Sequence, residues 1–135
     1  MNLTILYEDN HLIFVKKPVN VPVQEDKSKD LDLLNIVKAD IKERYNKPGN
    51  VYLGLVHRLD RPVGGVMVFA KTSKAASRLS DLIRRQQMER KYLAIVRGRP
   101  KAKAQRLEDY LVKNKKKNIV YPTSKDHKDI KNMLI

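Results

Sequence analysis

The feature that most constrains the fold is a continuous apolar run, Val66-Met67-Val68-Phe69-Ala70, directly after a loop that contains Pro62, Gly64 and Gly65. An uninterrupted apolar run of this length, bounded by turn residues, is typical of a buried strand. Proline and glycine break regular structure, so the chain must turn just before this strand begins. A second strand is predicted over residues 51–56 and leads into the same loop.

Two further short runs near the start of the chain, residues 3–7 and 12–16, predict a β-hairpin. The tetrapeptide between them, Glu8-Asp9-Asn10-His11, is polar and suits a turn. Pro18 and Pro22 then prevent regular strand pairing. Later in the chain, residues 92–96 predict another strand and residues 105–112 a last one, and the pattern decays from Lys113.

Two amphipathic helices are predicted from apolar residues at spacings of three and four. Asp30 is expected to cap the first helix, which ends at residues 46–49, and Thr72 or Ser73 the second, whose outer face is basic. The residues expected on the buried stripes are Leu31, Leu34, Val37, Ile41 and Tyr45 in the first helix and Ala76, Leu79 and Ile83 in the second.

Charge points to a polyanionic partner. The 29 Lys and Arg outnumber the 15 Asp and Glu, which leaves a net charge of +14. The segment from Arg84 to Lys117 holds 13 basic and 3 acidic residues and so carries +10 of that charge. Such a segment is typical of a surface that binds nucleic-acid phosphates, although a solubilising surface has the same composition.

Other classes of protein are disfavoured. No run approaches the roughly 18 apolar residues of a membrane span, and the first residues lack the layout of a signal peptide, so a cytoplasmic protein is expected. Without cysteine there is no disulfide or thiolate chemistry. We expect no metal, since a zinc site would depend on three scattered histidines and carboxylates.

The chemistry is expected at Asp60, which lies in the loop before the buried strand and is flanked by Arg58 and Arg61. The two arginines favour the charged form of the carboxylate, and a carboxylate beside phosphate-seeking cations is a plausible nucleophile toward RNA. An ordinary ion pair of a surface loop has the same composition, and from the residues alone both interpretations stay open.

A family resemblance favours the nucleophile. The stretch from His57 to Thr72, His-Arg-Leu-Asp-Arg-Pro-Val-Gly-Gly-Val-Met-Val-Phe-Ala-Lys-Thr, resembles the signature motif of the RluA-like family of pseudouridine synthases. Residues 6–18 resemble the family's opening hairpin, and residues 90–98 resemble its later tyrosine-bearing strand. The three motifs follow one another in the family's order. The resemblance covers about residues 3–112.

The resemblance implies an α+β fold with a mixed, largely antiparallel sheet flanked by helices, and isomerisation of uridine to pseudouridine in ribosomal or transfer RNA without a cofactor. It implies that Asp60 is the nucleophile, that Arg58 helps to hold RNA from which the target base has been flipped, and that Tyr92 packs against the uracil. His57 is expected to shape the loop. Phosphate contacts are expected from Arg61, Arg84, Arg85, Lys101 and Lys103.

Two departures from the family's pattern affect these expectations. Gly64 stands where the family usually has serine, and nothing after Lys113 resembles its Gly-Arg-x-His-Gln-Ile-Arg segment. We therefore expect residues 1–112 to be the N-terminal portion of the catalytic domain and residues 113–135 a basic, poorly patterned segment. On this basis the chain is a fragment or a shortened homologue, nearly inactive alone and prone to self-association through an exposed sheet edge.

Two other functions fit parts of the sequence. A non-catalytic RNA-binding module would use the basic segment without turnover. A hydrolase of small molecules would use an aspartate nucleophile, but the +10 segment argues against it.

Overall fold

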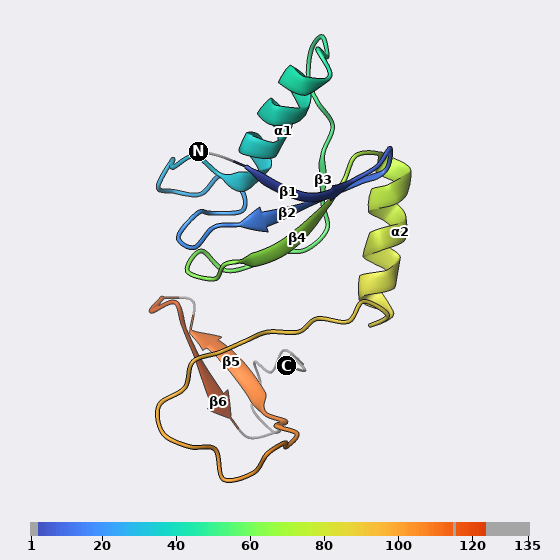
Figure 1. Ribbon diagram of the computed structural model, residues 1–135. Coiled ribbons are helices and arrows are strands. Elements are labelled where there is room, and N and C mark those ends of the chain that lie inside the picture. The colour runs from blue at the N-terminus through green and yellow to red at the C-terminus, as the bar shows by residue number, and fades with distance from the viewer. Residues whose placement is uncertain (1–2, 115, 124–135) are drawn as a thin grey trace. The chain divides into compact units, whose positions relative to one another are not determined.

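An antiparallel sheet of four strands organises the first part of the chain in the computed structural model, which describes residues 3–114 and 116–123. The strands are β1 (Thr4–Glu8), β2 (Leu12–Lys17), β3 (Gly54–Leu55) and β4 (Gly65–Ala70), in the spatial order β1-β2-β4-β3 (Figure 1). The predicted hairpin and the predicted buried strand are both confirmed. The strand predicted over residues 51–56 is shorter, because only two of its residues pair with β4.

Strand register decides which side chains enter the core. Along β2 and β4 the pairs Ile13↔Phe69 and Val15↔Met67 lie opposite each other, and all four side chains are buried. In the β1–β2 hairpin the pairing jumps between Ile5 and Tyr7, which places a β-bulge in the edge strand. A bulge bends and twists a strand locally.

Helix α1 (Leu33–Arg44) packs its apolar stripe on this sheet. Its buried residues are Leu33, Val37 and Ile41, whereas Leu31 is 66% exposed. The N-cap is Asp32, whose side chain accepts from the Asn35 N–H, so the prediction of Asp30 was wrong by two residues. The first two N–H groups of the helix, those of Leu33 and Leu34, donate to the backbone carbonyls of Pro22 and Val23. These hydrogen bonds fix the start of the helix.

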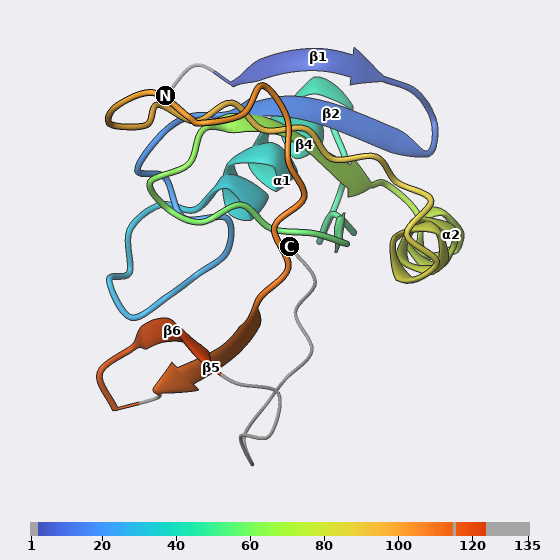
Figure 2. The ribbon, with the colours of Figure 1, turned by 90° about the horizontal axis from the view of Figure 1, so that it is seen from below.

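Helix α2 (Ser73–Arg84) begins at Thr72, one of the two predicted caps. It packs beside β3 and β4 and is seen along its axis in Figure 2. The predicted buried stripe is wrong in part, because Ala75 is the buried residue and Ala76, Leu79 and Ile83 are only half-buried. The helix approaches β3 closely: a Cβ added to Gly54 would lie 2.9 Å from the Cβ of Ala76. Gly54 therefore provides the space in which α2 packs.

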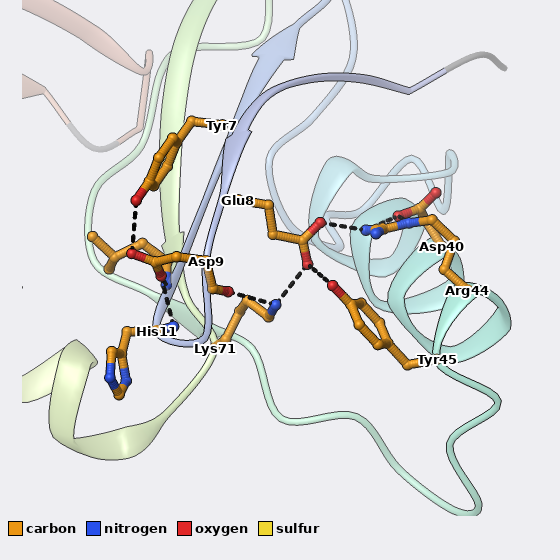
Figure 3. A network of polar contacts seen from close by, with 9 residues as sticks. Tyr7, Glu8, Asp9, His11, Asp40, Arg44, Tyr45 and Lys71 are labelled. Carbon is orange, nitrogen blue, oxygen red and sulfur yellow. Dashed lines mark hydrogen bonds and ion pairs between the residues drawn. The ribbon is translucent and has the colours of Figure 1, made fainter.

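Glu8, at the end of β1, centres a polar network at the hairpin-turn end of the sheet (Figure 3). Its carboxylate accepts from the Lys71 ammonium at 2.6 Å and from the Tyr45 hydroxyl at 3.1 Å, and pairs with Arg44 at 2.8 Å. Lys71 also donates to the backbone carbonyl of Asp9 at 2.7 Å. The network joins the end of α1 to β1 and to the residue after β4.

A second compact unit begins at Tyr92, and the first ends at Lys91. Its regular structure in the described residues is a hairpin of β5 (Tyr110–Asn114) and β6 (Ile119–Thr123). The prediction over residues 105–112 overlaps β5 but begins too early, and β6 was not predicted. Whether residue 112 separates the catalytic portion from a basic segment stays a prediction.

The strand predicted over residues 92–96 is not formed. Leu93 and Ile95 are fully exposed, at 104% and 106%. A strand requires a neighbour that accepts and donates its ladder hydrogen bonds, and no strand of the described residues pairs with this segment. Residues 92–96 have the apolar sequence of a strand, but the described residues provide no partner strand for them.

The α+β class is confirmed, and every strand pairing in the described residues is antiparallel. Within the same residues, neither helix is long and apolar enough to cross a membrane.

Candidate active site

Asp60 opens a tight turn before β4. Its backbone carbonyl accepts from the Val63 N–H at 2.9 Å, which closes the turn, and the side chain of Asp60 is exposed. Two residues after Val63, β4 begins and is paired on both sides farther along its length. The carboxylate is thus presented to solvent from a turn attached to a central strand of the sheet.

Lys17 lies beneath this turn. Alternation along β2 directs Ile13, Val15 and Lys17 toward the core, and the Lys17 side chain is completely buried. Its ammonium donates to three backbone carbonyls, those of Val63 at 2.6 Å, Arg61 at 3.0 Å and Pro18 at 3.1 Å. Two of these belong to the Asp60 turn. An ammonium has three N–H donors, so all of them are used in fixing the backbone.

Asp60 and Lys17 influence each other through space. Burial lowers the pKa of Lys17 below its ordinary value, and the negative charge of Asp60 opposes that shift. Among the described side chains no ion pair involves Asp60. The carboxylate therefore feels a nearby positive charge while its oxygens remain free of a cationic hydrogen-bond donor. Such an arrangement suits a nucleophile better than a structural ion pair does.

His57 shapes the segment that leads into the turn. Its Nε2 accepts from the Val68 N–H at 3.1 Å, in the part of β4 that lies beyond the two residues of β3. Burial, and secondarily the charge of Arg90, lowers the pKa of His57. The neutral ring keeps the lone pair that this hydrogen bond requires. The contact agrees with the expected role of His57 in shaping the loop.

Two glycines permit the chain to enter β4. Gly65 has φ +152°, a conformation that side chains with a Cβ rarely adopt. At Gly64 a Cβ would lie 3.1 Å from Val19 Cγ1 and 3.3 Å from the Lys17 carbonyl oxygen. The replacement of the family's serine by glycine at this position thus coincides with close packing against the segment after β2.

The two arginines beside Asp60 differ. Arg58 is exposed, and none of the ion pairs in the described residues includes it. Arg61 pairs with Asp30 and, at 3.8 Å, with Asp26. The carboxylates that Arg61 contacts are therefore those of a loop more than 30 residues earlier, and not that of Asp60.

The other expected RNA contacts are on the surface. Arg84 and Arg85 lie at the end of α2, where both pair with Asp81. Lys101 and Lys103 are exposed in an irregular segment of the second unit. Tyr92 is the first residue of that unit and is 63% exposed. Contact of these residues with RNA, and the pairing of Tyr92 with Asp60 in one site, stay predictions.

Lys17 and the loop that binds Arg61 were not predicted as parts of the site. Lys17 continues the alternation of Ile13 and Val15, which is a usable signal that it points inward. Asp26, Ser28 and Asp30 carry local turn chemistry, but nothing in the sequence links them to Arg61.

Comparison with known proteins agrees with the family resemblance seen in the sequence. The family model for RNA pseudouridylate synthase matches residues 11–134, which extends past residue 112, where the recognisable motifs end. The chain is 37% identical over 101 residues to tRNA pseudouridine synthase C of Haemophilus ducreyi, covering 73% of this chain and 38% of that protein. It is 33% identical over 110 residues to ribosomal large subunit pseudouridine synthase C of Escherichia coli, covering 82% and 33%.

A solved structure agrees as well. Human RNA pseudouridylate synthase domain containing 4 aligns with a TM-score of 0.53 and 30% identity over 62% of this chain and 30% of the human chain. Fold, loop and comparisons together define the family of the chain. The chain belongs to the RNA pseudouridylate synthase family, in its RluA-like branch. It spans about a third of the length of the curated relatives named above.

Proposed function

We propose that this chain acts in the isomerisation of uridine to pseudouridine in structured RNA, with Asp60 as the nucleophile. The observation that carries the proposal is the Asp60 turn, in which a buried ammonium and a closed backbone hydrogen bond hold an exposed carboxylate without an ion-pair partner in the described residues. The family match supports the reaction, and the sequence places Asp60 in the family's signature motif.

The reaction requires one bond to break and another to form at the same base. The bond between uracil N1 and ribose C1′ breaks, the base turns, and a bond from C5 to C1′ replaces it, while C5 loses a proton and N1 takes one up. A carboxylate forms the covalent intermediate, at C1′ or at C6, and both routes remain open. No electron leaves the system, so the reaction requires no redox cofactor.

RNA binding has to support base flipping, which costs a few kcal/mol of stacking. In this proposal the exposed Arg58 occupies the space that the base leaves, and Tyr92 packs against the uracil. The net charge of +14 favours contacts with RNA phosphates. In this proposal the residues that make such contacts include Arg84, Arg85, Lys101 and Lys103. The names of the relatives support transfer RNA or large-subunit ribosomal RNA as the substrate class. A cytoplasmic location belongs to the same proposal. Self-association through a sheet edge remains a further prediction.

An RNA-binding module without turnover is the alternative. Its support is that the Asp60 carboxylate is exposed to water. Exclusion of water protects a covalent intermediate, so a fully open site favours binding over catalysis.

Release of the C5 hydrogen distinguishes the two functions. Uridine-labelled ribosomal or transfer RNA is incubated with the 135-residue chain, with the same chain extended by a homologous C-terminal segment, and with Asp60→Asn in both. Release that disappears in Asp60→Asn supports the proposal. Salt-dependent RNA binding without release by either form would favour the binding module.

A further inference from the structure

Arg61 is fixed at both of its ends. Its backbone carbonyl accepts from the buried Lys17 ammonium at 3.0 Å. Its guanidinium donates to Ser28 Oγ at 3.1 Å, forms an ion pair with Asp30 and lies 3.8 Å from a carboxylate oxygen of Asp26. Arg61 follows Asp60 directly, so the same residue connects the turn to the core from below and to residues 26–30 from the side.

The partner of Arg61, the 26–30 loop, is itself organised by hydrogen bonds. The Asp26 carboxylate accepts from the backbone N–H and the hydroxyl of Ser28, at 2.8 and 2.5 Å. Ser28 Oγ accepts from the Asp30 N–H at 3.2 Å, and the Lys29 N–H donates to the Asp26 carbonyl. The loop therefore presents two carboxylates and a hydroxyl to Arg61 in a defined arrangement. Two residues after Asp30, Asp32 caps helix α1 and connects the loop to a core element.

We infer that Arg61 is a positioning residue for Asp60, and that its guanidinium anchors the turn to the 26–30 loop and does not bind RNA phosphate. The inference rests on the proposed role of Asp60 as the nucleophile. It replaces the expectation that Arg61 contributes a phosphate contact and extends the site to the 26–30 loop, which no motif marked.

Charge supports this division of roles. The Arg61 guanidinium is already paired with Asp30 and lies near Asp26, so a phosphate would have to displace these carboxylates to bind it. The guanidinium holds the pKa of Asp30 below its ordinary value, and Ser28, with a smaller contribution from Arg61, does the same for Asp26. Both carboxylates are therefore charged at neutral pH. Arg58, two residues before Asp60, shows no such pairing in the described residues and is available for phosphate.

Exposure sets the size of the expected effect. The side chains of Arg61, Asp26 and Asp30 are 43%, 45% and 50% exposed, and ion pairs at such positions add little to global stability. Their effect is expected in the local rigidity of the turn. Displacement of a reacting group by about 1 Å can lower a rate about 100-fold, so a small local change is sufficient to matter.

The first test is hydrogen exchange of the Val63 amide, which donates to the Asp60 carbonyl and reports closure of the turn. Arg61→Ala is expected to accelerate this exchange about tenfold with little change in global unfolding. Asp26→Asn combined with Asp30→Asn removes the anchor from the other side and should have a similar effect, which covers the case in which Arg61→Ala folds poorly. The matched control is Arg44→Ala, which removes an arginine from a two-carboxylate cluster at the opposite end of the sheet. After correction for any change in global stability, Arg44→Ala should leave the exchange rate of the Val63 amide unchanged.

The second test is the salt dependence of RNA binding. Arg58→Ala is expected to reduce the slope of log K against log salt by about 0.7 to 0.9, the value for one lost phosphate contact, and Arg61→Ala to leave it unchanged. In the form that shows C5-hydrogen release, Arg61→Ala lowers kcat while KM and the salt slope stay the same. A reduced salt slope in Arg61→Ala would overturn the inference. So would an unchanged exchange rate of the Val63 amide in both Arg61→Ala and the double variant of Asp26 and Asp30. Neither of those readouts depends on turnover, so failure of the proposed reaction is recognised separately.

Discussion

The two ends of the four-stranded sheet each hold a lysine beside a carboxylate, and they use it in opposite ways. At the hairpin-turn end, Lys71 donates to Glu8, which also pairs with Arg44. At the other end, Lys17 donates to three backbone carbonyls, and Asp60 has no ion pair in the described residues. One carboxylate is consumed in joining elements, whereas the other is left free above a fixed cation.

This difference is what the proposed function requires of a structural acid, Glu8, and a nucleophile, Asp60. Each end combines a lysine with a carboxylic acid, but the acceptors of the ammonium differ. Glu8 receives three donors, and although burial alone would raise its pKa, the hydrogen bonds from Lys71, Arg44 and Tyr45 lower it overall. Such an acid is stable and unreactive. In the proposed function, Asp60 keeps its lone pairs for a substrate because backbone carbonyls satisfy the neighbouring lysine.

The largest expected effects separate these two acids. Asp60→Asn should lower C5-hydrogen release by at least about a thousandfold, because a nucleophile is lost, while unfolding and RNA affinity stay close to wild type. Glu8→Gln should lower the free energy of unfolding by about 1–3 kcal/mol, because Lys71 loses its charged partner. Turnover per folded molecule should then be unchanged. The distinction between the two acids would be wrong if urea titrations showed a loss of stability in Asp60→Asn and release assays showed a loss of turnover in Glu8→Gln.

A second comparison lies within β2, where Lys16 is exposed and Lys17 buried. Lys17→Met leaves three carbonyls without their donor and should lower the free energy of unfolding by at least about 3 kcal/mol. Lys16→Met, on the opposite face of the same strand, should change it by less than about 0.5 kcal/mol. Equal losses in denaturant unfolding would show that the ammonium does not hold the turn.

The backbone at the start of β4 is the basis of the third prediction. Gly65→Ala should cost about 1–3 kcal/mol, because φ +152° lies outside the left-handed region that other residues visit, and the new Cβ would lie 3.4 Å from Leu59 Cδ1. Gly49→Ala is the control, since Gly49 has φ +73° and open space around its Cβ. Thermal unfolding of both variants measures the difference, and a smaller loss at Gly65 than at Gly49 would contradict the account.

Acid should loosen the His57–Val68 contact and the Glu8 network at different pH. His57 has a lowered pKa, so the stability it contributes is present above about 6.5, its unfolded value, and is lost as pH falls through the lower folded value. Glu8 also has a lowered pKa, so its contribution is present above 4.5 and is lost only below that value. Amide exchange near Val68 should therefore rise first on acidification, and near Lys71 later. His57→Gln, which accepts but does not titrate, should abolish the first step.

How far the sequence predicts this structure depends on whether the signal is local. The β2 and β4 strands follow from their runs of apolar residues, and Thr72 from its capping position. For α1, Asp30 and Asp32 both precede the helix, and only the contact of Asp32 with the Asn35 N–H, together with burial of Leu33, decides between them. Which of the two aspartates caps α1 therefore depends on which face of the helix packs against the sheet.

The candidate site shows the same limit. The sequence predicts the position of Asp60 in a turn before a buried strand, because proline, glycine and the apolar run are adjacent. It does not predict the partners of Arg61, which lie 31 and 33 residues away along the chain. Lys17 was missed because a lysine in a core position contradicts the usual assignment of charge to the surface, although the alternation of its strand points inward.

The three carbonyls around Lys17 also determine which amino acids that position accepts. An ammonium is a compact charge with three donors, and it meets three acceptors here. Arginine would bring a larger, planar group whose five N–H donors lie in a fixed fork, which does not match three carbonyls arranged around a single nitrogen. Lysine and arginine, often exchanged on protein surfaces, are therefore not equivalent at residue 17, for a reason of stereochemistry and not of charge.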